Sequence, residues 1–213
     1  MILTNCHTHF SSDFQNEIFQ IDVTQPCDVF HSVGIHPWNA SAYSVEEVGL
    51  LVRNSITNKT LAIGECGLDA LKGSSLEIQS KLFIEQIKLS EELALPLIIH
   101  CVKAWNELHA IRLKYRPKQP WVFHGMMKAG ILNQVVKSGM MVSFGLGILK
   151  HPKGEEMVLQ VPNNQILLET DDIQGEIKIL YEFVARVKQI SLQQINDEVT
   201  TNFKNTFRKW QIG

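Results

Sequence analysis

Six side chains of the metal-ligand type follow short apolar runs in the sequence: His7, His9, Glu65, His100, His124 and Asp171. Because side chains alternate along a strand, His7 and His9 project to the same face and can share one ion. Each of the other four has an ordinary structural alternative, as a partly buried histidine, a loop carboxylate or a helix N-cap. Taken together they have no common structural reason, so we predict a metal site.

The donor atoms indicate the chemistry of this site. Imidazole and carboxylate without thiolate suit Zn, Mn, Fe, Ni or, more weakly, Mg. Six ligands exceed what one catalytic ion needs if a position for water stays open, so we expect two ions. A pair of ions can activate a water and stabilise attacking and leaving oxygens together, which predicts hydrolysis. The three cysteines beside these ligands alternate toward the helices, and we expect them in the core: Cys6, Cys66 and Cys101.

The ligands need strands that bring their carboxyl ends to one face. Eight apolar runs are candidate strands: residues 1–4, 18–23, 30–34, 61–64, 97–100, 121–124, 140–144 and 166–168. Their continuous apolarity, in place of alternation, is typical of parallel strands covered on both faces. In parallel α/β proteins the carboxyl ends of the strands form the ligand-binding face, where every predicted ligand would lie.

Helical segments separate the strands. Capping boxes at residues 44–47, 74–77 and 191–194 mark helix starts, and further helices are expected over 105–115, 129–137 and 176–190, with a last helix over 192–210. This alternation predicts an α/β fold with a parallel sheet, either a (β/α)8 barrel or an open doubly wound sheet. Only eight residues, 10–17, lie between His9, after the first apolar run, and the second strand. They are too few for a helical crossover, so we expect a truncated first crossover: either the first helix is lost, or the second strand is irregular or antiparallel.

Bulk composition limits the classes of function. The chain has 213 residues and no linker or repeat, so we expect one domain over 1–213. A net charge of -2 argues against a high-affinity duplex binder. The longest apolar run is too short to span a membrane. The first residues lack the basic and apolar regions of a secretory signal, so we expect a cytoplasmic protein. The four cysteines form no CxxC pair, so we expect reduced thiols. We also expect a monomer.

The motifs, taken in order, resemble the TatD family of metal-dependent hydrolases, which are barrels related to the amidohydrolases. The resemblance runs nearly end to end. It rests on HxH at residues 7–9, GIHP at 34–37, GECGLD at 64–69, LPLIIH at 95–100, a lone histidine at 124 and ETD at 169–171. It implies a (β/α)8 TIM-type barrel, truncated in the first crossover, with a C-terminal helix packed outside.

The resemblance also implies an active site with two divalent ions, Mg, Mn or Zn. One ion would be bound by His7, His9, Glu65 and Asp171, and the other by Glu65, His100 and His124, with Glu65 bridging. It implies phosphodiester hydrolysis of DNA by a deoxyribonuclease, most often an exonuclease on single-stranded ends. A water activated by the ions would be the nucleophile, and Asp171 would orient or deprotonate it.

Departures from the family pattern concern the substrate face. Asn5 stands where the family has an acidic residue, and Lys103 stands where it has an arginine, which keeps a cation for phosphate but loses bidentate geometry. His36 is expected to line the mouth, and Trp38 either to stack a base or to pack at the rim. These changes keep two alternatives open: an amidohydrolase or esterase acting on a small molecule, and a non-catalytic barrel with weakened metal binding.

Overall fold

The computed structural model describes residues 2–10 and 15–210. The chain divides into two compact units, and the boundaries fall inside strands β2 (Glu17–Asp22) and β6 (Trp121–Phe123). The terminal unit consists of Met1–Phe19 and Val122–Gly213, and the central unit of Gln20–Trp121. Each unit is described by itself.

The terminal unit joins the first strand of the chain to its last strands. Strand β7 (Met141–Phe144) pairs in parallel with β6 and with β8 (Ile166–Leu168). Strand β1 (Asn5–Thr8) pairs in parallel with β2, and a parallel bridge links Thr8 to Asp171, just after β8. The chain therefore places residues near position 7 beside residues near position 171.

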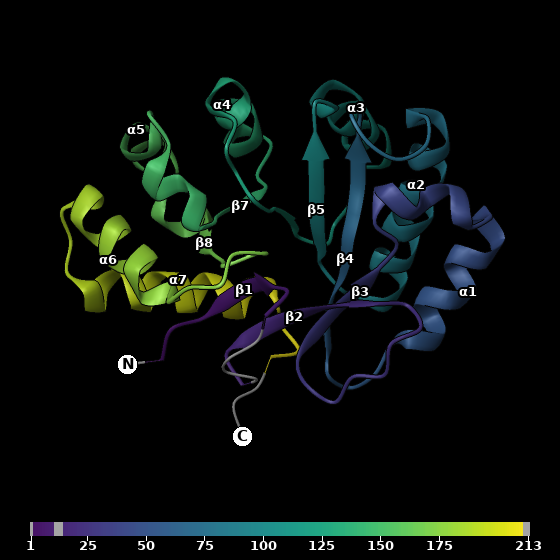
Figure 1. The fold of residues 1–213 in the computed structure, drawn as a ribbon, viewed down its shortest axis with the longest axis horizontal. Coiled ribbons are helices and arrows are strands. Elements are labelled where there is room, and N and C mark those ends of the chain that lie inside the picture. Colours follow the sequence, from purple (N-terminus) through teal and green to yellow (C-terminus); the bar gives the residue numbers. More distant parts are fainter. Residues whose placement is uncertain (1, 11–14, 211–213) are drawn as a thin grey trace. The chain divides into compact units, whose positions relative to one another are not determined.

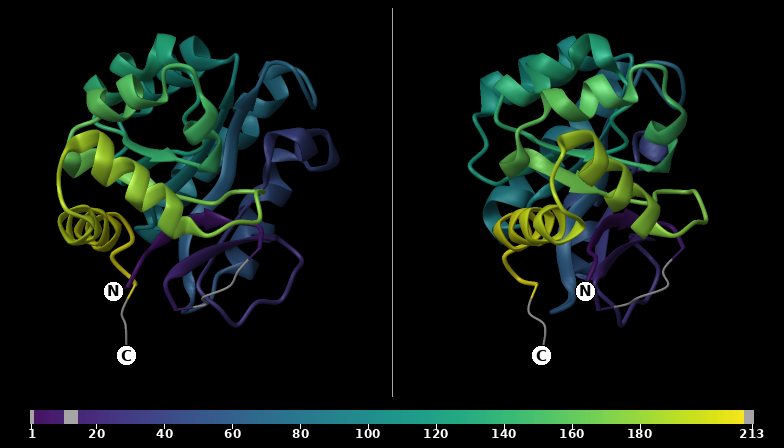
Figure 2. Two further views of the ribbon diagram at one scale, coloured as in Figure 1. Left: turned by 60° about the vertical axis from the view of Figure 1, so that its left-hand side comes forward. Right: turned by 90° about the vertical axis from the view of Figure 1, so that its left-hand side faces the viewer.

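Helices accompany these strands along the chain (Figure 1). They are α4 (Ala129–Lys137), α5 (Gly154–Gln160), α6 (Ile177–Lys188) and α7 (Leu192–Thr206), with 3-10 helices η2 (Leu146–Lys150) and η3 (Asn163–Gln165). Helix α7, the long yellow coil in Figure 2, packs against β8 and α6. Its Asn202 side chain donates hydrogen bonds to the carbonyls of Asn163 and Ile166, which fixes the helix to the start of β8.

The central unit is built on three parallel strands in chain order: β3 (His31–Gly34), β4 (Thr60–Asp69) and β5 (Leu97–Val102). Its helices are η1 (Pro37–Ala42), α1 (Val45–Ser55), α2 (Leu76–Leu93) and α3 (Trp105–Tyr115). All ten residues of β4 are buried. Helix α2 packs against β4 and α1, so β4 has a neighbouring strand at each edge and a helix on one face.

Eight strands, parallel wherever they pair within a unit and separated by helices from β3 onward, confirm the expected (β/α)8 TIM-type class. The truncated first crossover is also confirmed as far as residues 9–10 and 15–16 show, because they contain no helix; residues 11–14 lie outside the described residues. The connection from β2 to β3 likewise contains no helix, and the sequence predicted none there. No helix of the described segments is long and apolar enough to cross a membrane.

Several element boundaries differ from the predictions. The first strand covers Asn5–Thr8 and not residues 1–4, because the polar side chains of this stretch find buried partners. The last helix ends at Thr206, before the predicted end. Helix α5 was not predicted, because it has only seven residues and too short an apolar pattern.

The capping predictions are confirmed at two helices and wrong at one. Ser44 and Ser191 form capping boxes with Glu47 and Gln194. Helix α2 begins one residue later than the predicted box requires: Ser75 is the N-cap and accepts a hydrogen bond from Ile78 N. The carbonyl of Ser74 instead accepts from the Gln79 side chain at 2.7 Å, which draws Ser74 into the preceding loop.

Candidate metal centre

The terminal unit contains a cluster that we call the terminal cluster: His7, His124 and Asp171. One ligand atom from each residue lies within 4.8 Å of the others. His7 Nε2 is 3.4 Å from Asp171 Oδ1, and the rings of His7 and His124 are 4.7 Å apart. His9 lies at its edge, with Nε2 3.7 Å from the same Asp171 oxygen. Three strands therefore bring two imidazoles and a carboxylate into the range of one ion.

The backbone explains why Asp171 reaches the histidines of β1. Asp171 N donates to the carbonyl of His7 at 3.1 Å, and His9 N donates to the carbonyl of Asp171 at 2.9 Å. Asp171 has a φ of 54°, in the left-handed region that aspartate tolerates better than most residues. The chain thus turns sharply after β8 while it remains paired with β1, and this places the carboxylate between His7 and His9.

Glu169 contacts the terminal cluster through His124. Its side chain is fully buried, with Oε1 3.5 Å from His124 Nδ1, and it accepts a hydrogen bond from Gly125 N at 2.6 Å. A carboxylate in this position holds a histidine ring in one orientation and makes it a stronger ligand. This role could not be predicted from the sequence, although Glu169 is the first residue of the ETD motif.

Cys6 lies in the core beside Glu169, as strand alternation predicted. Its Sγ is 3.0 Å from Ser143 Oγ and 3.7 Å from Glu169 Oε2. Burial, together with the charge of Glu169, raises the pKa of the Cys6 thiol well above its ordinary value. Cys66 and Cys101 are also buried, and no disulfide joins the four cysteines, all of which lie in the described ranges. The prediction of core thiols is confirmed.

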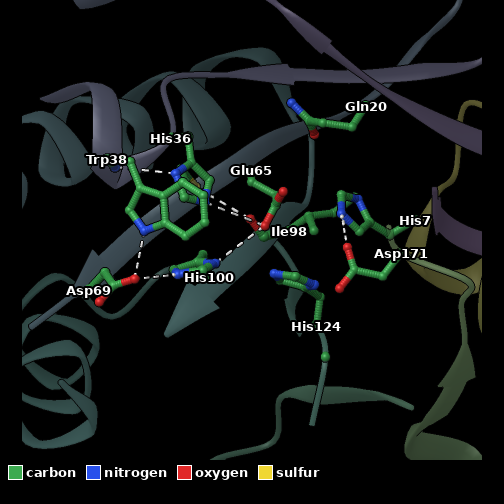
Figure 3. A network of polar contacts seen from close by, with 12 residues as sticks. His7, Gln20, His36, Trp38, Glu65, Asp69, Ile98, His100, His124 and Asp171 are labelled. Carbon is green, nitrogen blue, oxygen red and sulfur yellow. Dashed lines mark hydrogen bonds and ion pairs between the residues drawn. The ribbon is translucent and has the colours of Figure 1, made fainter. Parts of the chain in front are cut away.

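The central unit contains a second group, the central cluster: His36, Glu65 and His100. Their ligand atoms also lie within 4.8 Å of one another. Glu65 Oε1 is 3.4 Å from His100 Nδ1 and 3.7 Å from His36 Nε2, and Figure 3 shows both imidazoles pointing toward this carboxylate. His36, expected only to line the mouth, thus lies among the candidate ligands.

Asp69 orients His100 in the central cluster. Its Oδ2 lies 3.1 Å from His100 Nε2 and accepts the indole N–H of Trp38 at 2.6 Å, as the dashed lines in Figure 3 show. Burial alone would raise the pKa of Asp69, but hydrogen bonds from Trp38 and Leu71 N and the neighbouring His100 lower this pKa below its ordinary value. Asp69 therefore faces His100 as a carboxylate, which leaves Nδ1 of the imidazole for a metal ion.

Two buried glutamines of α2 hold the segments that carry this cluster. Gln86 accepts from Ile35 N at 2.8 Å and donates to the Ile35 carbonyl at 3.1 Å, directly before His36. Two helical turns earlier, Gln79 accepts from Asp69 N at 2.7 Å and donates to the Asp69 carbonyl at 2.9 Å. One face of α2 thus fixes the backbone beside two site residues. The sequence analysis did not identify either glutamine.

Gly67 explains the glycine between Glu65 and Asp69. It has a φ of 139°, and a Cβ at this position would overlap the carbonyl oxygen of His100. Strands β4 and β5 can approach closely here only because residue 67 has no side chain. The GECGLD motif therefore combines two site carboxylates with the glycine that lets His100 lie next to them.

Asn5, the departure from the family pattern, lies in a buried polar network. Its Nδ2 donates to Thr170 Oγ1 at 2.9 Å and to Glu17 Oε1 at 3.4 Å, and its Oδ1 accepts from Thr170 N at 3.1 Å. Thr170 immediately precedes Asp171. A buried carboxylate, that of Glu17, therefore lies beside Asn5, and the amide fixes the backbone next to a candidate ligand.

The structure groups the predicted residues unit by unit. His7, His9, His124 and Asp171 come together in the terminal unit, and Glu65, His100 and His36 in the central unit, with Trp38 beside them. His124 thus lies with His7 and Asp171, whereas the resemblance implied that it shares an ion with Glu65 and His100. A bridging role for Glu65 stays a prediction. Lys103 is exposed just after β5, with a left-handed backbone.

Both clusters fit a divalent ion. Each offers imidazole nitrogens and a carboxylate oxygen, the donor set that suits Zn, Mn or Fe. In each cluster one histidine is also contacted by a buried carboxylate outside the ligand set, the arrangement commonly found behind metal-bound histidines.

Comparison with known proteins gives matches over most of the chain. A family model described as TatD related DNase matches residues 3–208. The chain is 29% identical to an uncharacterized metal-dependent hydrolase, YabD, of Bacillus subtilis, over 84% of this chain and 78% of that protein. It is 31% identical to the 3'-5' ssDNA/RNA exonuclease TatD of Pantoea sp., over 66% of this chain and 56% of that protein.

A solved structure shows the same fold. The TatD homolog YjjV of Escherichia coli superimposes with a TM-score of 0.73 and 22% sequence identity, covering 90% of this chain and 86% of that one.

Proposed function

The chain belongs to the family of TatD related DNases, and from this premise we propose that it is a deoxyribonuclease that removes nucleotides from single-stranded DNA ends. It is a metal-dependent hydrolase of ester bonds. The observation that carries the proposal is the pair of His and carboxylate clusters on the strands of a (β/α)8 fold. The named activity of the Pantoea relative, on ssDNA and RNA, supports the choice of substrate.

We propose that two divalent ions bind, one at each cluster. His7, His124 and Asp171, with His9 at the edge, would hold one ion, and His36, Glu65 and His100 the other. When bound, such ions polarise a phosphoryl oxygen and lower the pKa of an attacking water. We also propose that residues 1–213 form one domain, because the family match spans both units. Reduced thiols support a cytoplasmic location.

The side chains of the protein have distinct roles in this mechanism. The Asp171 side chain is 30% exposed, so this carboxylate is accessible to water, and its proposed role is to orient the attacking water and accept its proton. Glu169 and Asp69 hold the imidazoles of His124 and His100 in one orientation. Lys103, just after β5, is the proposed contact to a substrate phosphate.

The test is a nuclease assay after removal and return of metal. Protein stripped by a chelator is given Mg, Mn or Zn and then an end-labelled single-stranded oligonucleotide, and products are resolved by length. We expect ion-dependent shortening from one end. His7→Asn and His100→Asn should each remove activity and lower the metal content. The matched control is His151→Asn, at the C-terminal end of η2, which should change neither.

Other outcomes would favour the alternatives. Ion-dependent cleavage of small esters or amides without cleavage of DNA would identify an esterase or amidohydrolase. Metal content below one equivalent per chain with neither activity would indicate a non-catalytic barrel. Asp171→Asn that keeps its metal and full activity would remove the proposed role of Asp171 in handling the proton.

A further inference from the structure

Trp38 is an exposed aromatic residue that is nevertheless fixed in position. The residue is 42% exposed. Its indole N–H donates to Asp69 Oδ2 at 2.6 Å, and its ring lies 4.6 Å from the His36 ring in an edge-to-face arrangement. Asp69 and His36 in turn contact His100 and Glu65 of the central cluster. The ring is therefore held open to solvent directly beside the candidate metal site.

Lys72 places a positive charge on the same ring. Its Nζ lies 3.3 Å from the centroid of the Trp38 ring, a cation–π contact. The loop that carries Lys72 is itself held, because the backbone N–H groups of Leu71 and Lys72 both donate to Asp69 Oδ1. One carboxylate thus fixes the tryptophan through one oxygen and the lysine loop through the other.

Gly73 keeps this loop against Pro37 and Trp38. It has a φ of 89°, and a Cβ there would lie 2.7 Å from the carbonyl oxygen of Pro37 and 3.0 Å from Trp38 Cα. Only glycine allows this approach. An exposed aromatic face and a cation held together before any ligand arrives lose little freedom on binding, which is the property of a preformed binding surface.

We infer that Trp38 and Lys72 form a nucleotide subsite, in which the exposed part of Trp38 stacks a base and Lys72 contacts the adjoining phosphate. The inference rests on the proposed function and names how that site holds single-stranded DNA. Aromatic stacking tolerates any base, as an exonuclease requires. A local cation also supplies the attraction for phosphate that a chain with a net charge of -2 lacks as a whole.

The subsite can be tested without catalysis, by binding in EDTA. The probes are single-stranded oligothymidylate and an abasic oligomer with the same number of phosphates. Wild type is expected to prefer oligothymidylate, and Trp38→Ala to lose that preference with a roughly 5- to 100-fold weaker affinity. Trp38→Phe keeps an aromatic ring and should retain part of the preference for oligothymidylate.

Lys72→Gln should weaken binding of both probes alike and lower the slope of log affinity against log salt by about 0.7. The matched control is Lys59→Gln, which removes another Lys–aromatic contact of the central unit, to Phe30 at 4.9 Å, and should change the binding of neither probe. Circular dichroism checks that each variant is folded.

Three results would overturn the subsite: no binding of either probe by wild type, equal binding of both, or an unchanged base preference in Trp38→Ala. Because binding is measured without metal, a protein that lacks nuclease activity does not for that reason give any of these three results. Conversely, a fully active nuclease can fail this test, so the two proposals are distinguishable.

Discussion

Glu169 shows how a residue outside a ligand set can control that set. It is fully buried and reaches His124 Nδ1, Gly125 N and Cys6 Sγ from one carboxylate. A buried charge is costly unless hydrogen bonds and neighbouring groups compensate it. We attribute its presence to the orientation of His124, because a ring fixed by a carboxylate is a better metal ligand.

Glu169→Gln tests this orientation. The change keeps the shape and the acceptor for Gly125 N but removes the charge next to His124. We expect metal affinity at the terminal cluster to fall by about 10- to 100-fold, as for other such partners of metal-bound histidines. Isothermal titration with Mn or Zn measures it. The control is Glu182→Gln on the exposed face of α6, and equal affinities in the two variants would contradict the role.

Strands and helices position the site through a few close approaches. Strand β4 supplies Glu65 and Asp69 on the same face, and β5 supplies His100 opposite Gly67. Helix α2 then ties down the chain at Ile35 and at Asp69 through Gln86 and Gln79. The positions of the side chains in the central cluster therefore depend on Gly67 and on one face of helix α2.

Gly67→Ala should damage the contact between β4 and β5. A methyl group there overlaps the carbonyl of His100, and a φ of 139° is strained for alanine, so we expect a loss of about 3 kcal/mol or more in the free energy of unfolding. Urea unfolding followed by circular dichroism measures it. The control is Gly130→Ala in α4, where a Cβ meets nothing within 4 Å, and which should stabilise by about 0.5 to 1 kcal/mol.

Gln86→Ala should loosen the segment that carries His36. It leaves the buried N–H and carbonyl of Ile35 without their partners, at a cost of about 1 to 3 kcal/mol for each group. Urea unfolding again gives the cost, and metal titration shows whether the central cluster weakens with it. Lys81→Ala, exposed on the same helix, should change stability by less than about 0.5 kcal/mol. A Gln86→Ala protein as stable as the Lys81→Ala protein would contradict the proposed role of Gln86 in holding the Ile35 backbone.

At the scale of the whole molecule, the terminal unit depends on contacts between the two ends of the chain. Tyr181 Oη donates to the Thr4 carbonyl at 2.8 Å, and Asp171 N donates to that of His7. These pairs are more than a hundred residues apart, so the terminal cluster requires nearly the complete chain. The central unit is continuous in sequence, from Gln20 to Trp121. Contacts so distant along the chain slow folding, because the loop-closure entropy must be overcome before they form.

Acid should destabilise the folded protein through His31. Burial lowers the pKa of His31 from its ordinary value of 6.5, although the contact with the Val29 carbonyl opposes this. The unfolded chain therefore takes up the proton at a higher pH than the native chain, so the contribution of His31 to stability is complete above about 6.5 and is lost as the pH falls below it.

The comparison of variants isolates this effect. Unfolding free energies of wild type and His31→Gln, measured from about pH 8 to pH 5, should show a steeper acid loss in wild type. His31→Gln should be less stable at the upper pH, because His31 also shares a 2.8 Å hydrogen bond with Thr60 Oγ1. His151→Gln is the control and should follow wild type. Equal slopes for His31→Gln and wild type would contradict the assignment.

The sequence by itself determined the donor types and the α/β class, because both follow from local pattern: apolar runs, caps and the side-chain alternation that puts His7 and His9 on one face. Local pattern left a barrel and an open sheet as alternatives; the family motifs indicated the barrel, and the strand order confirms it. It could not identify Glu169, Asp69, Gln79 or Gln86 as supports, since a buried carboxylate or amide is defined by the atoms opposite it, and those lie on other elements. The grouping of His124 with His7 and of His36 with His100 was likewise decided by tertiary structure, because only the paired strands set which ends meet.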